Sequence, residues 1–456
     1  MAKTNQPVEK VHTHTGGQAS HVSAHEELRR TVLTCLLWEN TFYEGGDSIA
    51  KRIAALIPKC ETKFVCALAI EARSRMQLRH APLWLMRCAI QEYSKNPNRH
   101  KNPKTGSQLR EALAEIIQRP DEMTEFLSLY WKDKRQPLAA CVKKGLADAF
   151  GRFNAYSLAK YNQMDKAVKL RDVLFLTHPK PDGQKGQPEL WKKLVDKTLE
   201  SPDTWEVALS SGVDKCATFT RLLKDGKLGG LATLRNLRNM VESGVDEDLI
   251  RERLKAGCER ALPFRFITAA KVVPQLEDAI ESAMFAAAKD LEKLFGSTGL
   301  LIDVSGSMVC GLHGEYGTRN DYTNRIDVAT GLAILVREKC EKVKIATFST
   351  RVVELPIRRG FALRDAITNS QEHRDTFLKG ALELLRSSSW QNLDRIIVIT
   401  DEQSQDGCAT AWTPNSYIVN VASYVQGVGY EKGWTHINGW SERVLDYIQF
   451  LEETKG

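Results

Sequence analysis

The sequence predicts two folded parts, an array of stacked α-helices followed by a doubly wound α/β domain. From residue 24 to residue 295 the apolar residues recur at helical spacing, with no convincing alternating strand pattern. At Ser297 the pattern changes sharply to short apolar runs that alternate with helical segments. The chain of 456 residues is also longer than one hydrophobic core usually supports. We therefore expect a multidomain α plus α/β protein.

The helical part, residues 24–295, consists of one amphipathic segment after another, with short polar, Pro or Gly breaks between them. Such helices cannot bury their apolar faces singly, so they must stack, as in HEAT-like solenoids. Because no fixed sequence period is visible, irregular repeats are expected. The expected helices are Ala24–Trp38, Asp47–Ile57, Thr62–Met76, Ala81–Tyr93, Ser107–Ile117, Asp121–Tyr130, Leu138–Tyr161, Glu189–Leu199, Thr204–Ser210, Lys215–Leu223, Gly230–Met240, Glu247–Lys255, Leu262–Val272 and Pro274–Leu294.

The C-terminal part, residues 296–456, alternates apolar runs with helical patterns. This order favours a mostly parallel, Rossmann-like sheet with helices on both faces. The expected strands are Thr298–Val304, Val343–Phe348, Arg395–Ile399 and Tyr417–Val421, and the expected helices are Arg325–Lys339, Phe361–Ile367, Phe377–Leu385 and Ser441–Glu452.

The first 23 residues are polar and are expected to form a disordered tail. They lack the apolar centre of a signal peptide, and the chain contains no run of about eighteen apolar residues, so no membrane partner is expected. The ten cysteines are scattered without a Cys-x-x-Cys pair, which argues against a zinc site or a disulfide framework. A reducing, cytoplasmic location is expected.

The net charge of +7 is unevenly distributed along the chain. Residues 1–295 carry a net charge of +10, whereas residues 296–456 carry −3. A basic segment that also contains aromatic residues extends from Tyr130 to Lys185. Lys and Arg neutralise phosphates and aromatic rings stack on unpaired bases, so a polyanion partner is one interpretation. Solvated helix faces are the other interpretation of the same charges.

Polar oxygen ligands follow the apolar runs of the C-terminal part. The run that starts at Gly299 ends in Asp303, which is followed by Ser305 and Ser307, and a second run ends at Asp401. Thr376 stands directly ahead of a helical pattern between them. In open α/β sheets ligands bind just past the carboxyl ends of the strands, and hard cations such as Mg²⁺ prefer oxygen ligands. The sequence therefore predicts a divalent metal site, with Mg²⁺ the best match.

The pattern Asp303-x-Ser305-x-Ser307, followed by Thr376 and Asp401, resembles the metal-ion-dependent adhesion site of a von Willebrand factor A-type domain. The resemblance implies that the hydroxyl groups bind the ion directly and that the two carboxylates hold it largely through water. In that family glycines usually precede the threonine, which is not the case here. Taken alone, Asp-x-Ser-x-Ser also fits a solvated turn that caps a helix.

Five further motifs precede this domain in a fixed order, and together they resemble the TROVE family of Ro autoantigen proteins. The resemblance covers nearly the whole chain from about residue 24, and it implies a closed ring of HEAT-like helices. The outside of that ring would bind small noncoding Y RNAs, and its central hole would take single-stranded 3′ ends of misfolded RNAs. The motifs are Leu36-Leu37-Trp38-Glu39-Asn40-Thr41-Phe42-Tyr43-Glu44, Lys160-Tyr161, His178-Pro179-Lys180, Leu234-Arg235-Asn236-Leu237 and Leu262-Pro263-Phe264-Arg265.

Six residues are candidates for RNA binding. Lys160, Arg171 and His178 fall in the segment that resembles the Y RNA-contacting part of the family, and Lys180 belongs to the same motif as His178. The alternative for His178 is a histidine that packs within its loop. Arg235 and Asn236 have apolar neighbours on a helix, so the charged group either lines the ring's cavity or pairs with a carboxylate between helices.

No catalytic set is recognisable, because the chain has no P-loop motif and no cluster of acids for a two-metal nuclease. We expect a protein that is not an enzyme and that acts as an RNA-binding ribonucleoprotein component in RNA quality control or as an RNA scaffold. The alternative is a metal-dependent protein-interaction module that captures the carboxylate of a partner such as an exoribonuclease. A metal-dependent nuclease is a third and weaker interpretation.

Overall fold

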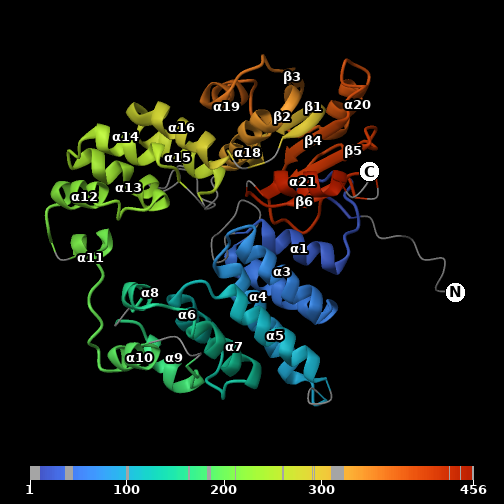
Figure 1. The fold of residues 1–456 in the computed structure, drawn as a ribbon. Helices are drawn as coiled ribbons and strands as arrows, with labels where there is room; N and C mark the ends of the chain where they lie inside the picture. The colour runs from blue at the N-terminus through green and yellow to red at the C-terminus, as the bar shows by residue number, and fades with distance from the viewer. Residues whose placement is uncertain are drawn as a thin grey trace. The chain divides into compact units, whose positions relative to one another are not determined.

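The computed structural model describes residues 11–35, 45–98, 102–162, 165–181, 186–210, 212–258, 261–289, 291, 293–309, 323–430, 432–441 and 443–453. The chain forms two compact units, and Figure 1 shows their helices and strands coloured along the chain. Unit 1 comprises Met1–Ile49, Gly229–Val241 and Asp246–Gly456, and unit 2 comprises Ala50–Leu228 and Glu242–Val245. This division differs from the boundary expected at residue 296, because helices far from the sheet in sequence belong to the same unit as the sheet.

Among the described residues of unit 2, all regular structure is helical. Its helices stack in two rows: α3, α5, α7 and α9 contact one another in succession, while α4 contacts α6 and α6 contacts α9. Gly145 of α7 allows close packing on α5, since a Cβ at this position would lie 2.8 Å from the carbonyl oxygen of Arg110. The helices are α2 (Gly46–Leu56), α3 (Thr62–Ser74), α4 (His80–Lys95), α5 (Pro103–Ile116), α6 (Pro120–Tyr130), α7 (Ala140–Phe150), α8 (Ala155–Lys160), α9 (Leu170–Thr177), α10 (Gln187–Val195), α11 (Trp205–Ser210) and α12 (Lys215–Lys224).

Two details of unit 2 differ from the sequence prediction. The helix expected over Leu138–Tyr161 is divided into α7 and α8, because the side chain of Asn154 accepts the amide N–H of Ser157 (2.9 Å) and caps a new helix. The short helix α9 was not predicted at all. The motif over residues 36–44 lies outside the described residues.

Unit 1 contains a six-stranded sheet with strand order β3-β2-β1-β4-β5-β6. All neighbouring strands are parallel except the edge pair β2–β3. The predicted doubly wound, mostly parallel sheet is therefore confirmed. The short strand β6 was missed, because its four residues include polar Thr435 and Asn438 and give no apolar run. The strands are β1 (Leu294–Asp303), β2 (Cys340–Phe348), β3 (Val352–Glu354), β4 (Arg395–Thr400), β5 (Asn415–Asn420) and β6 (Thr435–Asn438).

Helices cover both faces of this sheet (Figure 1). On one face α20 packs its apolar side against Leu301 of β1 and Val398 of β4, with the indole of Trp390 fully buried among them. On the other side α18 contacts β1, β2, β4, α15 and α19. Because α18 is enclosed in this way, it is apolar around most of its circumference. The helices of unit 1 are α1 (Ala24–Leu33), α13 (Gly230–Glu242), α14 (Glu247–Lys255), α15 (Pro263–Val272), α16 (Glu277–Ala287), α17 (Gly306–Val309), α18 (Arg325–Lys339), α19 (Gly360–Thr368), α20 (Leu378–Arg386) and α21 (Arg443–Glu453).

Residues 11–20 differ from the disordered tail that the sequence suggested over residues 1–23. The hydroxyl of Thr13 donates to the carbonyl oxygen of Ser404 (2.9 Å), and the amide of His14 donates to Oε1 of Gln403 (2.8 Å). Ser20 forms a β-bridge with Gly427. These contacts use backbone and polar groups, so a hydropathy pattern gives no sign of them. In the described part of the chain, every helix is too short or too polar to span a lipid bilayer.

Candidate functional site

The loop after β1 begins with a fully buried carboxylate. Asp303 is the last residue of β1 and lies at the carboxyl edge of the sheet. The strand order reverses at β1, because β2 lies on one side of it and β4 on the other. Its Oδ1 accepts the amide N–H of Ser305 (2.9 Å), and its Oδ2 accepts the hydroxyl of Thr400 (2.6 Å) at the end of β4. The loops after β1 and β4 are thus joined through this one side chain.

The loop after β4 brings a second carboxylate to the same place. The Ser307 hydroxyl donates to Oδ2 of Asp401 (2.6 Å), and the oxygens of Ser305 and Ser307 lie 3.4 Å apart. The amide N–H of Gln403 donates to the other carboxylate oxygen of Asp401 (3.1 Å). The structure therefore brings four of the five sequence-predicted ligands together.

The fifth predicted ligand, Thr376, lies on a neighbouring segment that backbone hydrogen bonds hold against both loops. The amide of Gly306 donates to the carbonyl oxygen of Arg374 (2.7 Å), and the amide of Gln405 donates to the carbonyl oxygen of Thr376 (2.9 Å). Thr376 is buried, and its carbonyl oxygen also accepts the hydroxyl of Ser404 (3.3 Å).

The electrostatics of the cluster favour a cation. Burial, together with the nearby charge of Asp401, raises the pKa of Asp303 to about 7. Two buried carboxylates and three hydroxyls offer only oxygen atoms, which suits a hard divalent cation such as Mg²⁺. Within the residues that the structure describes, no group of three or more His, Cys, Asp or Glu side chains could hold a metal ion. Hydroxyl groups are therefore necessary to any metal site here.

A buried ion pair that sequence reasoning missed supports the loop after β4. Glu402, next to Asp401, adopts a left-handed backbone conformation (φ 61°) and is completely buried. Its carboxylate bonds to the guanidinium of Arg30 on α1 and to Nδ1 of His436 (2.9 Å). Burial alone would raise the pKa of Glu402, but the charges of Arg30 and His436 lower it below its ordinary value. The run of acids after β4 was visible in the sequence, whereas its partner on α1 was not.

Four of the predicted RNA-binding residues lie on α8, on α9 and in the residues that follow α9 in unit 2. Lys160 ends α8, and its Nζ lies 5.7 Å from the centre of the Tyr161 ring. Arg171 is on α9 and pairs with Asp172 (Nε–Oδ1 3.8 Å). His178 follows α9 with φ 47°, and both His178 and Lys180 are exposed. The ring of His178 is therefore not packed into its loop.

The other two predicted residues lie on α13 in unit 1. Arg235 is exposed and lines a cavity, and no ion pair of Arg235 is present among the described residues. Asn236 is buried, and its Nδ2 donates to the carbonyl oxygen of Ala232 (2.9 Å). The cavity that Arg235 lines lies between two helices of unit 1, so the expected position in the ring's cavity stays a prediction. Asn236 itself faces the protein interior.

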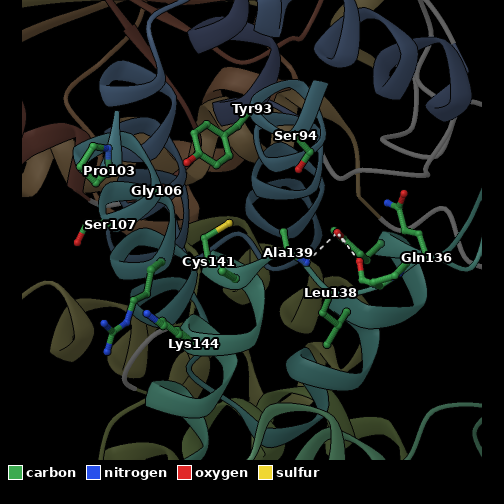
Figure 2. A pocket seen from close by; sticks show the side chains of 14 residues that line it. Tyr93, Ser94, Pro103, Gly106, Ser107, Gln136, Leu138, Ala139, Cys141 and Lys144 are labelled. Atoms are coloured by element: carbon green, nitrogen blue, oxygen red, sulfur yellow. Dashed lines mark hydrogen bonds between the residues drawn. The ribbon is translucent and has the colours of Figure 1, made fainter. Parts of the chain in front are cut away.

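A second cavity, of about 620 Å³, opens in unit 2 where α4 meets the first turns of α5 and α7 (Figure 2). Its charged lining residues are Arg110 and Lys144, and none of the described residues that line it is acidic. Arg110 bonds to both carboxylate oxygens of Asp148 (2.6 and 2.9 Å). The hydroxyl of Tyr130 fixes one wall through the backbone of residues 137 and 139. The charge of Arg110 is thus balanced by Asp148, and sequence reasoning did not single out this cavity.

A comparison with known protein families shows which family this chain is in. The model of the TROVE domain matches residues 30–198 and 195–373. The chain belongs to the TROVE family. Proteins of this family are RNA-binding ribonucleoprotein components.

The fold of this TROVE chain is similar to that of the Ro (RSR) protein of Deinococcus radiodurans. The two chains superpose with a TM-score of 0.60 and 16% sequence identity, over 95% of this chain and 100% of that one. The predicted fold class, helices followed by a Rossmann-like domain, is thereby confirmed.

Two curated relatives also match parts of this TROVE chain. Telomerase protein component 1 of Rattus norvegicus is 22% identical across 52% of this chain. Telomerase protein component 1 of Mus musculus is 34% identical across 18% of this chain. The chain spans only 12% and 4% of the length of these relatives.

Proposed function

We propose that this TROVE chain is a non-enzymatic ribonucleoprotein component that binds small noncoding, Y-like RNA and the single-stranded ends of misfolded RNA. It would act in RNA quality control or as an RNA scaffold in the cytoplasm. The observation that carries the proposal is the set of cationic side chains at α8, α9 and the following residues. Lys160 and Lys180 have no carboxylate partner among the described residues, so their charges are available to phosphates.

An electrophoretic mobility shift tests RNA binding directly. The probe is a structured RNA with a single-stranded 3′ tail, titrated at several salt concentrations. Binding should weaken steeply with salt, because each neutralised phosphate releases a counterion. The variant Lys160→Ala/Lys180→Ala should bind about tenfold or more weakly and lower the salt slope by about two.

The matched control is Lys192→Ala/Lys193→Ala, which removes the same charge from the exposed side of α10 in the same unit. This control should bind RNA nearly as well as the unaltered chain. Equal losses in both double variants would show that only total charge matters, and no binding by the unaltered chain at low salt would end the proposal.

The proposal includes a divalent cation, with Mg²⁺ the best match, held by Asp303, Ser305, Ser307, Asp401 and Thr376. The donor set supports it, because these side chains present only oxygen, and burial together with the nearby charge of Asp401 raises the pKa of Asp303. The ion would neutralise these carboxylates and leave a coordination position for the carboxylate of a partner. Isothermal titration with Mg²⁺ and Mn²⁺ should show one site in the unaltered chain and none in Ser305→Ala/Ser307→Ala.

The same double variant distinguishes the alternative function, a protein-interaction module. That function is favoured if Ser305→Ala/Ser307→Ala loses a carboxylate-bearing protein partner, such as an exoribonuclease, while it binds RNA normally. The RNA-scaffold proposal predicts instead that RNA binding continues without the metal and that it depends on the basic residues of unit 2.

A further inference from the structure

The first residues that the structure describes, 11–20, form a small hairpin. His12 and Gln18 face each other as an antiparallel pair between its two arms. The turn is closed by the amide of Gly16, which donates to the carbonyl oxygen of Thr13 (3.0 Å). We call this segment the N-terminal hairpin. Because its own hydrogen bonds define its shape, it can dock on another surface as one unit.

The turn of the N-terminal hairpin docks on the loop after β4. The hydroxyl of Thr13, a buried residue, donates to the carbonyl oxygen of Ser404 (2.9 Å). The hydroxyl of Thr15 donates to the carbonyl oxygen of Gln403 (3.0 Å), and the amide of His14 donates to Oε1 of the same glutamine (2.8 Å). Consecutive residues of the turn are therefore fixed on Gln403 and Ser404.

Gly17 brings the backbone of the hairpin into direct contact with the same loop. It is buried, and a Cβ at this position would clash with the carbonyl oxygens of Ser404 and Gln405. The φ angle of Gly17 lies outside the left-handed region, so the close contact, and not the backbone conformation, requires glycine here. Gly17→Ala therefore disturbs the docking and leaves the backbone of the hairpin itself unstrained.

The two loop residues under the hairpin also hold the segments that carry predicted metal ligands. The amide of Gln403 donates to the carboxylate of Asp401 (3.1 Å), and its Nε2 donates to the carbonyl oxygen of Asp401 (3.2 Å). The hydroxyl of Ser404 donates to the carbonyl oxygen of Thr376 (3.3 Å) and accepts the amide of Leu378 (3.2 Å). A single residue thus separates the hairpin from Asp401, and a single residue separates it from Thr376.

The chain that follows the hairpin attaches to the same region again. The amide of Ser20 donates to the carbonyl oxygen of Gly427 (3.0 Å). Helix α1 comes next, and its Arg30 forms the buried ion pair with Glu402. The first part of the chain therefore holds the loop after β4 at three consecutive positions, residues 402–404.

We propose that the N-terminal hairpin is a clamp that positions the divalent-metal site, so that docking of the hairpin and binding of the cation strengthen each other. A loop that is already held in place loses less conformational freedom when an ion binds to it. Such coupling is reciprocal, so the ion also tightens the docking of the hairpin. The inference rests on the proposed metal site and deepens it, because Thr13, Thr15 and Gln403 become positioning residues. A hairpin with a purely structural role would stabilise unit 1 and leave the affinity for the ion unchanged.

Isothermal titration of the full chain with Mn²⁺, well below its unfolding temperature, measures the effect of the hairpin on the ion. Thr13→Val removes the hydroxyl that bonds to the loop, and Gly17→Ala disturbs the backbone contact. Both variants should bind Mn²⁺ about tenfold more weakly, within the usual range of coupling between two sites. Thr13→Ser retains the hydroxyl and should bind nearly as tightly as the unaltered chain. The matched control is Gln18→Ala, which removes an exposed side chain of the same hairpin and should leave the affinity unchanged.

Hydrogen exchange of residues 11–20, followed by mass spectrometry, measures the effect of the ion on the hairpin. The amides of His14 and Ser20 bond to groups outside the hairpin, so their exchange reports its docking. Saturating Mn²⁺ should slow this exchange by up to about tenfold in the unaltered chain, because reciprocal coupling has the same magnitude in both directions. In Ser305→Ala/Ser307→Ala, Mn²⁺ should leave the exchange unchanged.

The outcomes separate a clamp from a structural hairpin and from a failure of the metal site. If Thr13→Val and Gly17→Ala unfold at a lower temperature but bind Mn²⁺ as tightly as the unaltered chain, the inference is overturned and the metal site stands. Exchange that is the same with and without Mn²⁺, or an equal loss of affinity in Gln18→Ala, would also overturn it. If the unaltered chain binds no Mn²⁺, the metal site and the clamp are both refuted, and the proposed RNA binding is judged by its own test.

Discussion

Replacing Arg30 with Met should strongly destabilise unit 1. Arg30 and its partner Glu402 are 372 residues apart in the sequence. The Arg30 side chain is completely buried. Its guanidinium bonds to Glu402, to the hydroxyl of Tyr430 (2.7 Å) and to the carbonyl oxygens of Tyr424 (3.1 Å) and Gln426 (3.2 Å). Arg30→Met leaves the Glu402 carboxylate in the interior, with Nδ1 of His436 (2.9 Å) as its remaining side-chain partner.

The expected cost follows from the burial of both charges. Removing one partner of a buried ion pair typically costs about 3–5 kcal/mol, because the other charge stays desolvated. With a change in Tm of about 2–4 °C per kcal/mol for units of this general size, the unfolding of unit 1 should occur about 6–20 °C lower. The double variant Arg30→Met/Glu402→Gln removes the buried charge and should recover a large part of this loss.

Differential scanning calorimetry of the full chain measures the effect for the single variants and the double variant. A coupling energy of at least about 1 kcal/mol between positions 30 and 402 is expected from the double-mutant cycle. If Arg30→Met lowers the transition by less than about 2 °C, or if the two substitutions are additive, the reasoning about a buried, mutually dependent pair is wrong.

Three further predictions concern stability. The pKa of Glu402 is lowered in the folded chain. Its ionised carboxylate therefore stabilises the fold above the unfolded pKa of about 4.3, and this stabilisation is lost as the pH falls through the lower folded pKa. Thermal melts should show a steeper loss of stability below about pH 5 in the unaltered chain than in Glu402→Gln. Gly299→Ala places a Cβ 2.6 Å from the Trp390 ring and should destabilise unit 1 by about 1–3 kcal/mol in denaturant unfolding. Gly145→Ala places a Cβ 2.8 Å from a backbone oxygen of α5 and should produce a comparable loss in unit 2 alone; a shift in the unit 1 transition would contradict this assignment.

The general architecture was predictable because it depends on local patterns. Helical periodicity identified the stacked helices, and apolar runs that end in acids identified β1 and β4 together with Asp303 and Asp401. Parallel strands present their carboxyl ends at one edge, so the convergence of the two loops followed from strand order. The exact break between α7 and α8 was less accessible, because a capping side chain at Asn154 outweighs an otherwise continuous helical pattern.

The sequence by itself determined which elements form, which residue types follow each strand, and how charge is divided along the chain. Only the tertiary structure decided which distant groups meet: Arg30 with Glu402, Thr13 with Ser404, and Arg238 with Arg265 around one cavity. It also assigned α1 and α13–α16 to the unit that contains the sheet. The physical reason is that a helix or strand is set by neighbours a few residues away, whereas these contacts depend on how completed elements pack. Contacts between side chains hundreds of residues apart leave no periodic pattern in the sequence.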